Sequence, residues 1–294
     1  MINFTKMHGC GNDYVYINGM QEHLPDHKKA AVYFSNRHFG CGSDGLIFIN
    51  SSDIADFAME MYNADGSCAE MCGNGIRCLG KYVYDHKLTD KEEIDVETPA
   101  GVKHLFLHVE NGAVTEVTVD MGSPILTPEL IPVTASLFAG RDRVVNEPIV
   151  VDGREYRVTC VSMGNPHAVV FIDGDEKALP LEQLGPLFEN HSAFPKRVNT
   201  EFVRVRDRTH LDMRVWERGS GETFACGTGS CASVVACILN GLTENEAELK
   251  LQGGSLKVRW DTDSNTVYLT GPAVTVFEGQ MLCLEAPVHN FARD

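Results

Sequence analysis

Two features that mark membrane and exported proteins are missing from this 294-residue chain. Its purely apolar runs, such as VVACIL at 234–239, are far shorter than the roughly 20 residues that cross a bilayer as a helix. The segment MINFTKMHGCGNDY at its start lacks the basic patch and apolar stretch of a signal peptide. We therefore expect a cytoplasmic protein that has no membrane partner.

An excess of positive charge is also missing. The chain has 41 acidic and 25 basic residues, which give a formal charge of -16. Proteins that bind nucleic acid or anionic lipid surfaces use Lys and Arg to neutralise phosphate charge. We therefore expect no nucleic acid among its partners.

The cysteines are numerous, but none of them form a C-x-x-C pair. Ten cysteines are present without the spacing that is typical of zinc sites or thioredoxin-like motifs. A chain of this length without an export signal does not predict a disulfide framework either. We expect no metal, and most of the thiols should be small buried side chains. These are Cys10, Cys41, Cys68, Cys78, Cys160, Cys231, Cys237 and Cys283.

A dinucleotide-binding pattern appears at 40–45, where GCGSDG fits G-x-G-x-x-G. In a nucleotide-binding unit this pattern follows a strand and opens a helix. Here the order is reversed, because a helical segment precedes it and the strand-like GLIFIN follows. We therefore expect no cofactor.

Alternating apolar and polar residues predict that most of the chain forms strands. The clearest strand segments are 45–50, 56–63, 201–207 and 210–217. Asn111-Gly112 and Gly253-Gly254 predict hairpin turns. Helices are predicted over 28–39, 75–86 and 230–242. The last is apolar on nearly every face, so we expect a curved sheet to enclose it. The predicted class is α+β.

An internal repeat is the strongest pattern in the sequence. Cys72 and Cys226, 154 residues apart, are each followed by Gly-x-Gly and a helical segment. The strands before them align at the same offset, and Gly11-Asn12 aligns with Gly164-Asn165 at an offset of 153. The repeat predicts two pseudo-symmetric domains. Together with the hairpins and the enclosed helix, it leads us to expect that each domain is a mostly antiparallel β-roll or barrel around a central helix. A proline-rich break at 121–133 predicts the boundary between the two domains. The first is expected to contain 1–120 together with 274–294, and the second 121–273.

Two cysteines at helix starts, facing one cleft, indicate acid/base chemistry. The unpaired N–H groups and the positive end of a helix dipole favour a thiolate, so we expect a usable base near neutral pH. The same N–H groups suit a substrate carboxylate. If one sulfur lies on each face of the adjacent carbon, one removes a proton and the other returns one from behind. The pattern thus predicts a two-base racemase or epimerase.

Other polar residues give weaker indications when they are taken singly. His167 is consistent with a hydrogen-bonded core histidine or with a residue that tunes a cysteine. Glu217 is consistent with an exposed charge at a strand end or with a role in the site. The asparagines and Arg218 lie at strand ends and turns, where Asn is frequent for backbone reasons alone.

Together these motifs resemble the diaminopimelate epimerase family. The resemblance runs through nearly the whole chain, in KMHGCGNDYVYI, NRHFGCGSDGLI, YNADGSCAEMCGNGIRC, VSMGNPHAVV, RVNTEF, WERGSGETFACGTGSCAS and LQGGSLKV. It implies a cofactor-independent enzyme that interconverts LL- and meso-diaminopimelate, a precursor of lysine and peptidoglycan. It also implies that the substrate is closed between two β-rich halves, and that the enzyme is a homodimer.

The resemblance also implies roles for individual residues. Cys72 and Cys226 would be the acid/base pair, and Glu217 and His167 would adjust them and bind the reacting amine. Backbone N–H groups at two places would hold the carboxylate, namely Gly73 with Asn74 and Gly227 with Thr228. The rest of the substrate would contact Asn12, Asn63, Asn165, Asn199 and Arg218. Gly45 stands where some members have a substrate-contacting glutamine.

Two other functions compete with this one. Proline racemases and hydroxyproline epimerases share the fold and mechanism, but they typically have MCGHG where this chain has MCGNG, and they lack ERGSGE. A thiol redox or metal-sensing protein would account for ten cysteines, although the absence of C-x-x-C argues against it.

Overall fold

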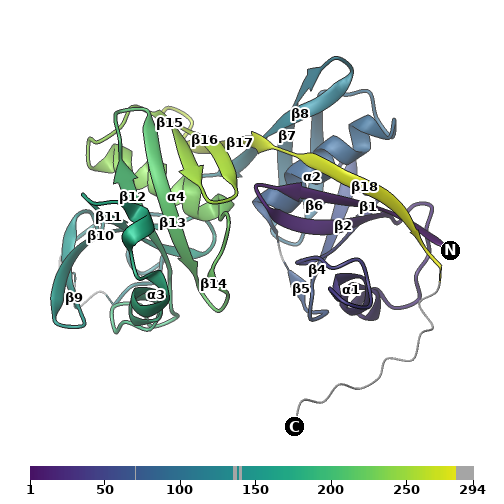
Figure 1. Ribbon diagram of the computed structural model, residues 1–294. Helices are drawn as coiled ribbons and strands as arrows, with labels where there is room; N and C mark the ends of the chain where they lie inside the picture. The colour runs from purple at the N-terminus through teal and green to yellow at the C-terminus, as the bar shows by residue number, and fades with distance from the viewer. Residues whose placement is uncertain (70, 135–137, 139–140, 283–294) are drawn as a thin grey trace, which may run out of the picture.

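The computed structural model describes residues 1–69, 71–134, 138 and 141–282. Within this described part, no helix is long and apolar enough to span a membrane. Figure 1 shows two lobes, with β8 and β17 running between them. Strands predominate in both lobes, which confirms the predicted α+β class.

The first lobe contains the elements from β1 to β8. They are β1 (Ile2–Gly9), β2 (Asn12–Asn18), α1 (His27–Ser35), β3 (Gly45–Asn50), β4 (Phe57–Asn63), β5 (Cys68–Ala69), α2 (Gly73–Asp85), β6 (Glu93–Thr98), β7 (Gly101–Glu110) and β8 (Ala113–Gly122).

The second lobe contains β9 to β17, after which β18 returns to the first lobe. The elements are β9 (Glu147–Val151), β10 (Arg154–Ser162), β11 (Pro166–Phe171), η2 (Glu176–Ala178), α3 (Leu181–Glu189), β12 (Asn199–Val205), β13 (His210–Glu217), β14 (Gly221–Glu222), α4 (Gly227–Leu239), β15 (Glu246–Leu251), β16 (Gly254–Asp261), β17 (Thr266–Pro272) and β18 (Val274–Met281).

The two lobes pair their strands in the same order. In the first, β1–β2 is antiparallel, β2–β3 parallel, β3–β4 antiparallel and β4–β6 parallel. In the second, β10–β11, β11–β12, β12–β13 and β13–β15 repeat that sequence of directions. The pseudo-symmetric architecture predicted from the repeat is therefore confirmed. The lobes join where β17 pairs with β8, while β18 pairs with β1. The domain boundaries themselves stay a prediction, and 283–294 lies outside the described residues.

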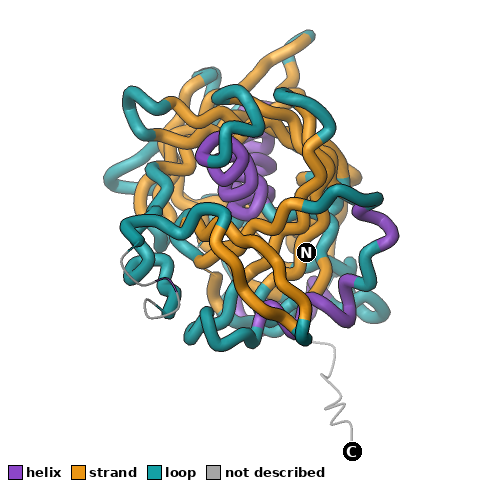
Figure 2. The backbone as a smooth tube through the Cα atoms, turned by 90° about the vertical axis from the view of Figure 1, so that its left-hand side faces the viewer, coloured by secondary structure: helices purple, strands orange, loops and turns teal. Residues whose placement is uncertain are grey.

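Each lobe wraps its sheet around one helix. Figure 2 shows helix surrounded by a ring of strands. Helix α4 is buried along most of its length, as its all-round apolar sequence predicts, and Ser230 and Ser233 are buried with it. Ser230 Oγ donates to the Cys226 carbonyl, 2.8 Å away, which removes the cost of burying that hydroxyl.

The predicted helices differ from the observed ones at their ends. Helix α1 ends at Ser35 because the Asn36 side chain accepts hydrogen bonds from the His38 and Phe39 N–H groups, which turns the chain. Helices α2 and α4 begin two and three residues earlier than predicted, directly after Cys72 and Cys226. The Gly-x-Gly pairs therefore lie inside the first turn of each helix. Helix α3 was missed, although it occupies the place in the second lobe that α1 has in the first.

Candidate active site

The two candidate cysteines cap the two enclosed helices. Cys72 and Cys226 have extended backbones, with φ of -132° and -117°, which lets each side chain turn back over its helix start. Each sulfur accepts a hydrogen bond from the third residue of the helix, Gly75 N or Gly229 N, at 3.4 Å. Both thiols thus lie at the N-terminal end of a helix, where the dipole favours negative charge.

The two helix starts meet at the junction of the lobes. A Cβ placed on Gly73 would lie 3.8 Å from the Gly227 Cα, so glycines at both positions allow this close approach. Asn74 Nδ2 donates to the Ala225 carbonyl at 3.3 Å, which joins the first cysteine loop to the residue before Cys226. The prediction that both cysteine motifs converge on one place is therefore confirmed.

An asparagine pair surrounds the first cysteine. Cys72 Sγ and Asn74 Nδ2 both donate to Asn12 Oδ1, each at 3.3 Å. Asn12 Nδ2 in turn donates to Asp44 Oδ2 at 2.8 Å. Since a carboxylate only accepts, Asp44 holds the Asn12 amide with its oxygen toward the thiol.

A buried histidine and a buried glutamate lie beside the second cysteine. Thr228 Oγ1 is 3.5 Å from Cys226 Sγ and accepts a hydrogen bond from Asn165 Nδ2 at 3.2 Å. Asn165 Oδ1 lies 3.0 Å from His167 Nε2, and His167 Nδ1 lies 2.7 Å from Glu201 Oε1. The ring of this fully buried histidine is thus held from both sides, by Asn165 and by Glu201.

Glu217 acts electrostatically on both thiols. It ends β13, accepts a hydrogen bond from Thr223 Oγ1, and its pKa is raised by burial. Its negative charge raises the pKa of Cys226 and also that of Cys72. Of the two interpretations of Glu217 offered by the sequence, an exposed charge at a strand end is therefore excluded.

Burial changes the expected behaviour of the thiols. Desolvation raises the pKa of Cys72, although the Gly75 and Asn74 N–H groups and the Arg77 charge lower it. The pKa of Cys226 is raised well above its usual value, first by desolvation and then by Glu217 and Glu201. The prediction of a thiolate near neutral pH is therefore wrong for the free protein, because loss of water outweighs the helix ends.

The remaining candidates have partners of their own. Asn199 lies beside His167 in the β11–β12 register, and its Oδ1 accepts from Arg218 N at 2.8 Å. The Arg218 guanidinium donates to the Lys196 carbonyl, and Asn63 Nδ2 donates to Ser67 Oγ. None of these contacts reaches a cysteine, so the geometry links Asn63 and Arg218 to the site less directly.

The surroundings of position 45 leave no room for a side chain. A Cβ there would lie 2.1 Å from the Tyr62 carbonyl oxygen and 2.8 Å from the Tyr14 ring. The backbone of β4 and this aromatic ring therefore exclude a side chain, and a glutamine at this position would require the strands to shift.

Sequence reasoning missed Glu201 and Arg77. Both side chains are fully buried beneath the helix starts. The repeat contained a signal, because the offset of 154 aligns Glu201 with Ile47 and Arg77 with Cys231. In each pair a charged residue stands opposite an uncharged one, and this difference marks a position that packing alone does not explain.

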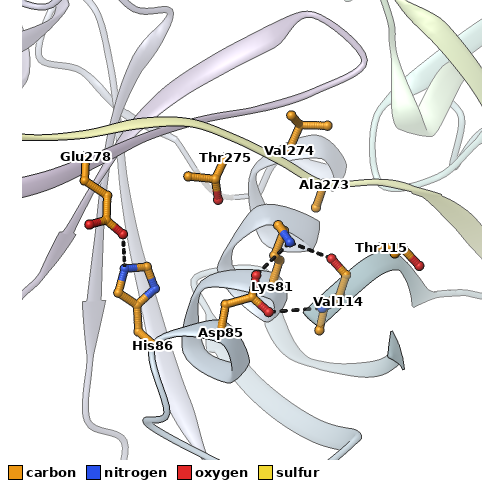
Figure 3. A pocket seen from close by; sticks show the side chains of 9 residues that line it. All are labelled: Lys81, Asp85, His86, Val114, Thr115, Ala273, Val274, Thr275 and Glu278. Carbon is orange, nitrogen blue, oxygen red and sulfur yellow. Dashed lines mark hydrogen bonds and ion pairs between the residues drawn. The ribbon is translucent and has the colours of Figure 1, made fainter. Parts of the chain in front are cut away.

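A surface groove lies away from this site. Figure 3 shows it between the end of α2, β8 and β18. Its charged side chains are paired with one another. Lys81 binds Asp85 at 2.7 Å, and His86 binds Glu278 at 3.1 Å. The groove therefore gives no better candidate than the paired cysteines.

Solved structures of other proteins share this fold. A probable proline racemase from Agrobacterium radiobacter matches with a TM-score of 0.70 and 14% identity over 98% of this chain and 95% of that one. A PhzF-family protein from Bacillus anthracis matches with a TM-score of 0.69 and 17% identity over 96% and 99%. At these identities the likeness concerns the fold.

Closer relatives identify the family. A family model for diaminopimelate epimerase matches residues 4–127 and 159–276. The diaminopimelate epimerase of Agathobacter rectalis is 60% identical over 283 residues, which cover 95% of this chain and 99% of the relative. That of Acetivibrio thermocellus is 55% identical over 280 residues, covering 95% and 98%. The chain belongs to the diaminopimelate epimerase family.

Proposed function

We propose that this chain interconverts LL-2,6-diaminopimelate and meso-2,6-diaminopimelate, and that Cys72 and Cys226 exchange the α-proton without a cofactor. The observation that carries the proposal is the pair of cysteines that cap two abutting helices. Such a placement offers one thiol to each face of a carbon whose carboxylate lies at the helix ends.

The proposed reaction has one proton removed and one returned. One cysteine, as thiolate, takes the α-proton, and the other, as thiol, donates its proton to the opposite face, so the centre inverts. Backbone N–H groups of Gly73, Asn74, Gly227 and Thr228 stabilise the charge that develops on the carboxylate.

The other residues are assigned to binding and tuning. Glu217 and His167 set the charge around the thiols and contact the reacting amine. The rest of the substrate is bound by Asn12, Asn63, Asn165, Asn199 and Arg218. We also infer a homodimer from the family resemblance, which light scattering on the purified protein would test. The cytoplasmic location stays a prediction from the sequence.

Isotope exchange tests the proposal. The reduced protein, freed of pyridoxal phosphate, is incubated with LL-diaminopimelate in deuterium oxide. We expect meso product that carries deuterium at the inverted α-carbon, and no product from Cys72→Ala or Cys226→Ala. Unlabelled product, or turnover that survives either substitution, would refute the mechanism. Turnover of proline instead would favour the racemase alternative.

A further inference from the structure

Arg77 is a buried cation without a buried counter-ion. Its side chain is fully buried in α2. It donates to the Gly73 carbonyl at 3.0 Å, to Asn74 Oδ1 at 2.9 Å and to the Pro272 carbonyl at 3.4 Å, all of which are neutral. Among the described residues, no carboxylate oxygen lies within 4.0 Å of a guanidinium nitrogen of Arg77, the distance limit for an ion pair. Burying a charge in this way is costly unless an anion compensates it.

The surrounding strands leave room for this guanidinium. A Cβ on Gly9 of β1 would lie 2.9 Å from Arg77 Nη2, and one on Gly271 of β17 would lie 3.2 Å from Nε. Two strands from different parts of the chain thus have glycine where the guanidinium passes. The charge is held in place by packing from both sides.

Arg77 is connected to both cysteine loops through one amide. A guanidinium only donates, so it fixes Asn74 with Oδ1 toward itself and Nδ2 turned away. Asn74 Nδ2 then reaches the Ala225 carbonyl, next to Cys226, and Asn12 Oδ1, which also accepts from Cys72. Arg77 therefore orients the first turn of α2, where the proposed carboxylate site lies.

The charge is present on one helix only. The position equivalent to Arg77 on α4 is Cys231, an uncharged thiol whose pKa burial raises to about 12. The titratable groups that interact with Cys72 are Arg77, Glu217, Tyr14, Tyr16 and Cys78. Those that bear on Cys226 are led by Glu217 and Glu201, both acidic. An anion is thus favoured at the first cysteine relative to the second.

We propose that Arg77 is a positioning residue that supplies the fixed positive charge beneath the carboxylate site and favours the thiolate of Cys72 over that of Cys226. The proposal rests on the proposed function, in which these two cysteines exchange the proton. Its chemical partner is the anionic substrate carboxylate, which gains a second negative charge as the α-proton leaves.

Thiol alkylation separates this role from turnover. Wild type, Arg77→Met and Arg77→Lys are treated with limiting iodoacetamide across pH 6–10, and mass spectrometry measures the modification of each cysteine. We expect Arg77→Met to shift the Cys72 profile upward by about one pH unit, as for loss of a nearby opposite charge. Arg77→Lys should retain the Cys72 profile, because it keeps the charge. The Cys226 profile should move less in both variants.

Activity gives a second measurement. Arg77→Met should lower kcat/KM by about 100-fold, the usual effect of losing one transition-state stabiliser, and Arg77→Lys should recover part of it. Cys231→Ala is the matched control, since it truncates the equivalent buried residue of α4 and should leave the Cys72 profile unchanged.

Three results would overturn the proposal. One is an unchanged Cys72 profile in a folded Arg77→Met variant. Another is an equal shift in Arg77→Met and Arg77→Lys, which would indicate packing alone. The third applies if circular dichroism shows that Arg77→Met does not fold, because the wild-type protein then provides the test. Alkylation of its Cys226 at a lower pH than its Cys72 would contradict the proposal that Arg77 favours the Cys72 thiolate. Failure of the isotope experiment with a shifted Cys72 profile would instead refute the proposed function and leave the electrostatic role of Arg77 in place.

Discussion

The two lobes have the same backbone architecture but differ in the charged residues that they contain. Strand directions, enclosed helices and capping cysteines repeat from one lobe to the other. The residues at equivalent positions differ, and the pairs are Tyr14 and His167, Gly45 and Asn199, Ile47 and Glu201, Asn63 and Glu217, and Arg77 and Cys231. The substrate carbon is chiral, so the groups on its two faces need different surroundings. The repeated architecture thus supplies the geometry, and different residues at a few equivalent positions supply the asymmetry.

The largest expected difference between the lobes concerns the glycine whose N–H group donates a hydrogen bond to each cysteine sulfur, Gly75 in the first lobe and Gly229 in the second. A Cβ on Gly229 would lie 2.5 Å from Glu201 Oε1 and 3.2 Å from Cys226 Sγ, whereas one on Gly75 meets the end of the Ile47 side chain at 2.8 Å. We expect Gly229→Ala to lower kcat/KM by about 100-fold, since displacement of reacting groups by 1 Å has that effect. Gly75→Ala should cost much less, because Ile47 can rotate. Steady-state kinetics check this, and equal losses would contradict it.

The second largest effect is expected from removing the Glu201 carboxylate, which lies next to the start of α4. Glu201→Gln breaks the buried pair with His167, which should lower the free energy of unfolding by about 3 kcal/mol. The equivalent change in the first lobe, Ile47→Val, should cost about 1 kcal/mol. Urea denaturation of both variants measures the difference. A smaller loss for Glu201→Gln than for Ile47→Val would mean that the pair does not stabilise the second lobe.

A side chain at position 45 should destabilise the first lobe without improving substrate binding. The added Cβ would meet the β4 backbone, which cannot move without disturbing the sheet. We expect Gly45→Ala to cost about 2 kcal/mol, in the range for overpacking. Gly174→Ala is the control, since a Cβ there meets nothing within 4 Å. Thermal unfolding should separate the two variants, and equal melting temperatures would show that the strands adapt.

The smallest expected effect is a gain in stability. Burial raises the pKa of Glu217 in the folded state, so its contribution to stability is present at acid pH and is lost as pH rises through the folded pKa. Glu217→Gln should therefore melt above wild type at pH 8, with a difference that narrows toward pH 4. Glu155→Gln on the exposed part of β10 should show no such trend. Melting curves across this pH range test it, together with the loss of activity that the proposed role of Glu217 requires.

Much of the fold followed from local patterns and the repeat. Strands β3 and β13 begin and end as the alternating residues predict, and both predicted hairpins form. The first turns at Asn111-Gly112 as predicted, whereas the second turns one residue earlier than predicted, at Gln252-Gly253, because Gly254 already pairs with Leu251. Helix α3 was missed because its sequence, LEQLGPLFE, contains Gly185 and Pro186. Gly185 is needed there, since a Cβ would lie 2.1 Å from the Trp216 ring. The local sequence does not reveal this requirement, because Trp216 belongs to β13, which is distant in sequence.

The sequence by itself determined that two cysteines, 154 residues apart, begin equivalent helices, because spacing and glycine pattern are local properties of the chain. Only the tertiary structure decided what surrounds them. Glu201 and Arg77 reach the site from a strand and a helix face whose neighbours are distant in sequence. Desolvation depends on how completely those neighbours exclude water, and it raised the thiol pKa values where the helix ends alone had predicted the opposite.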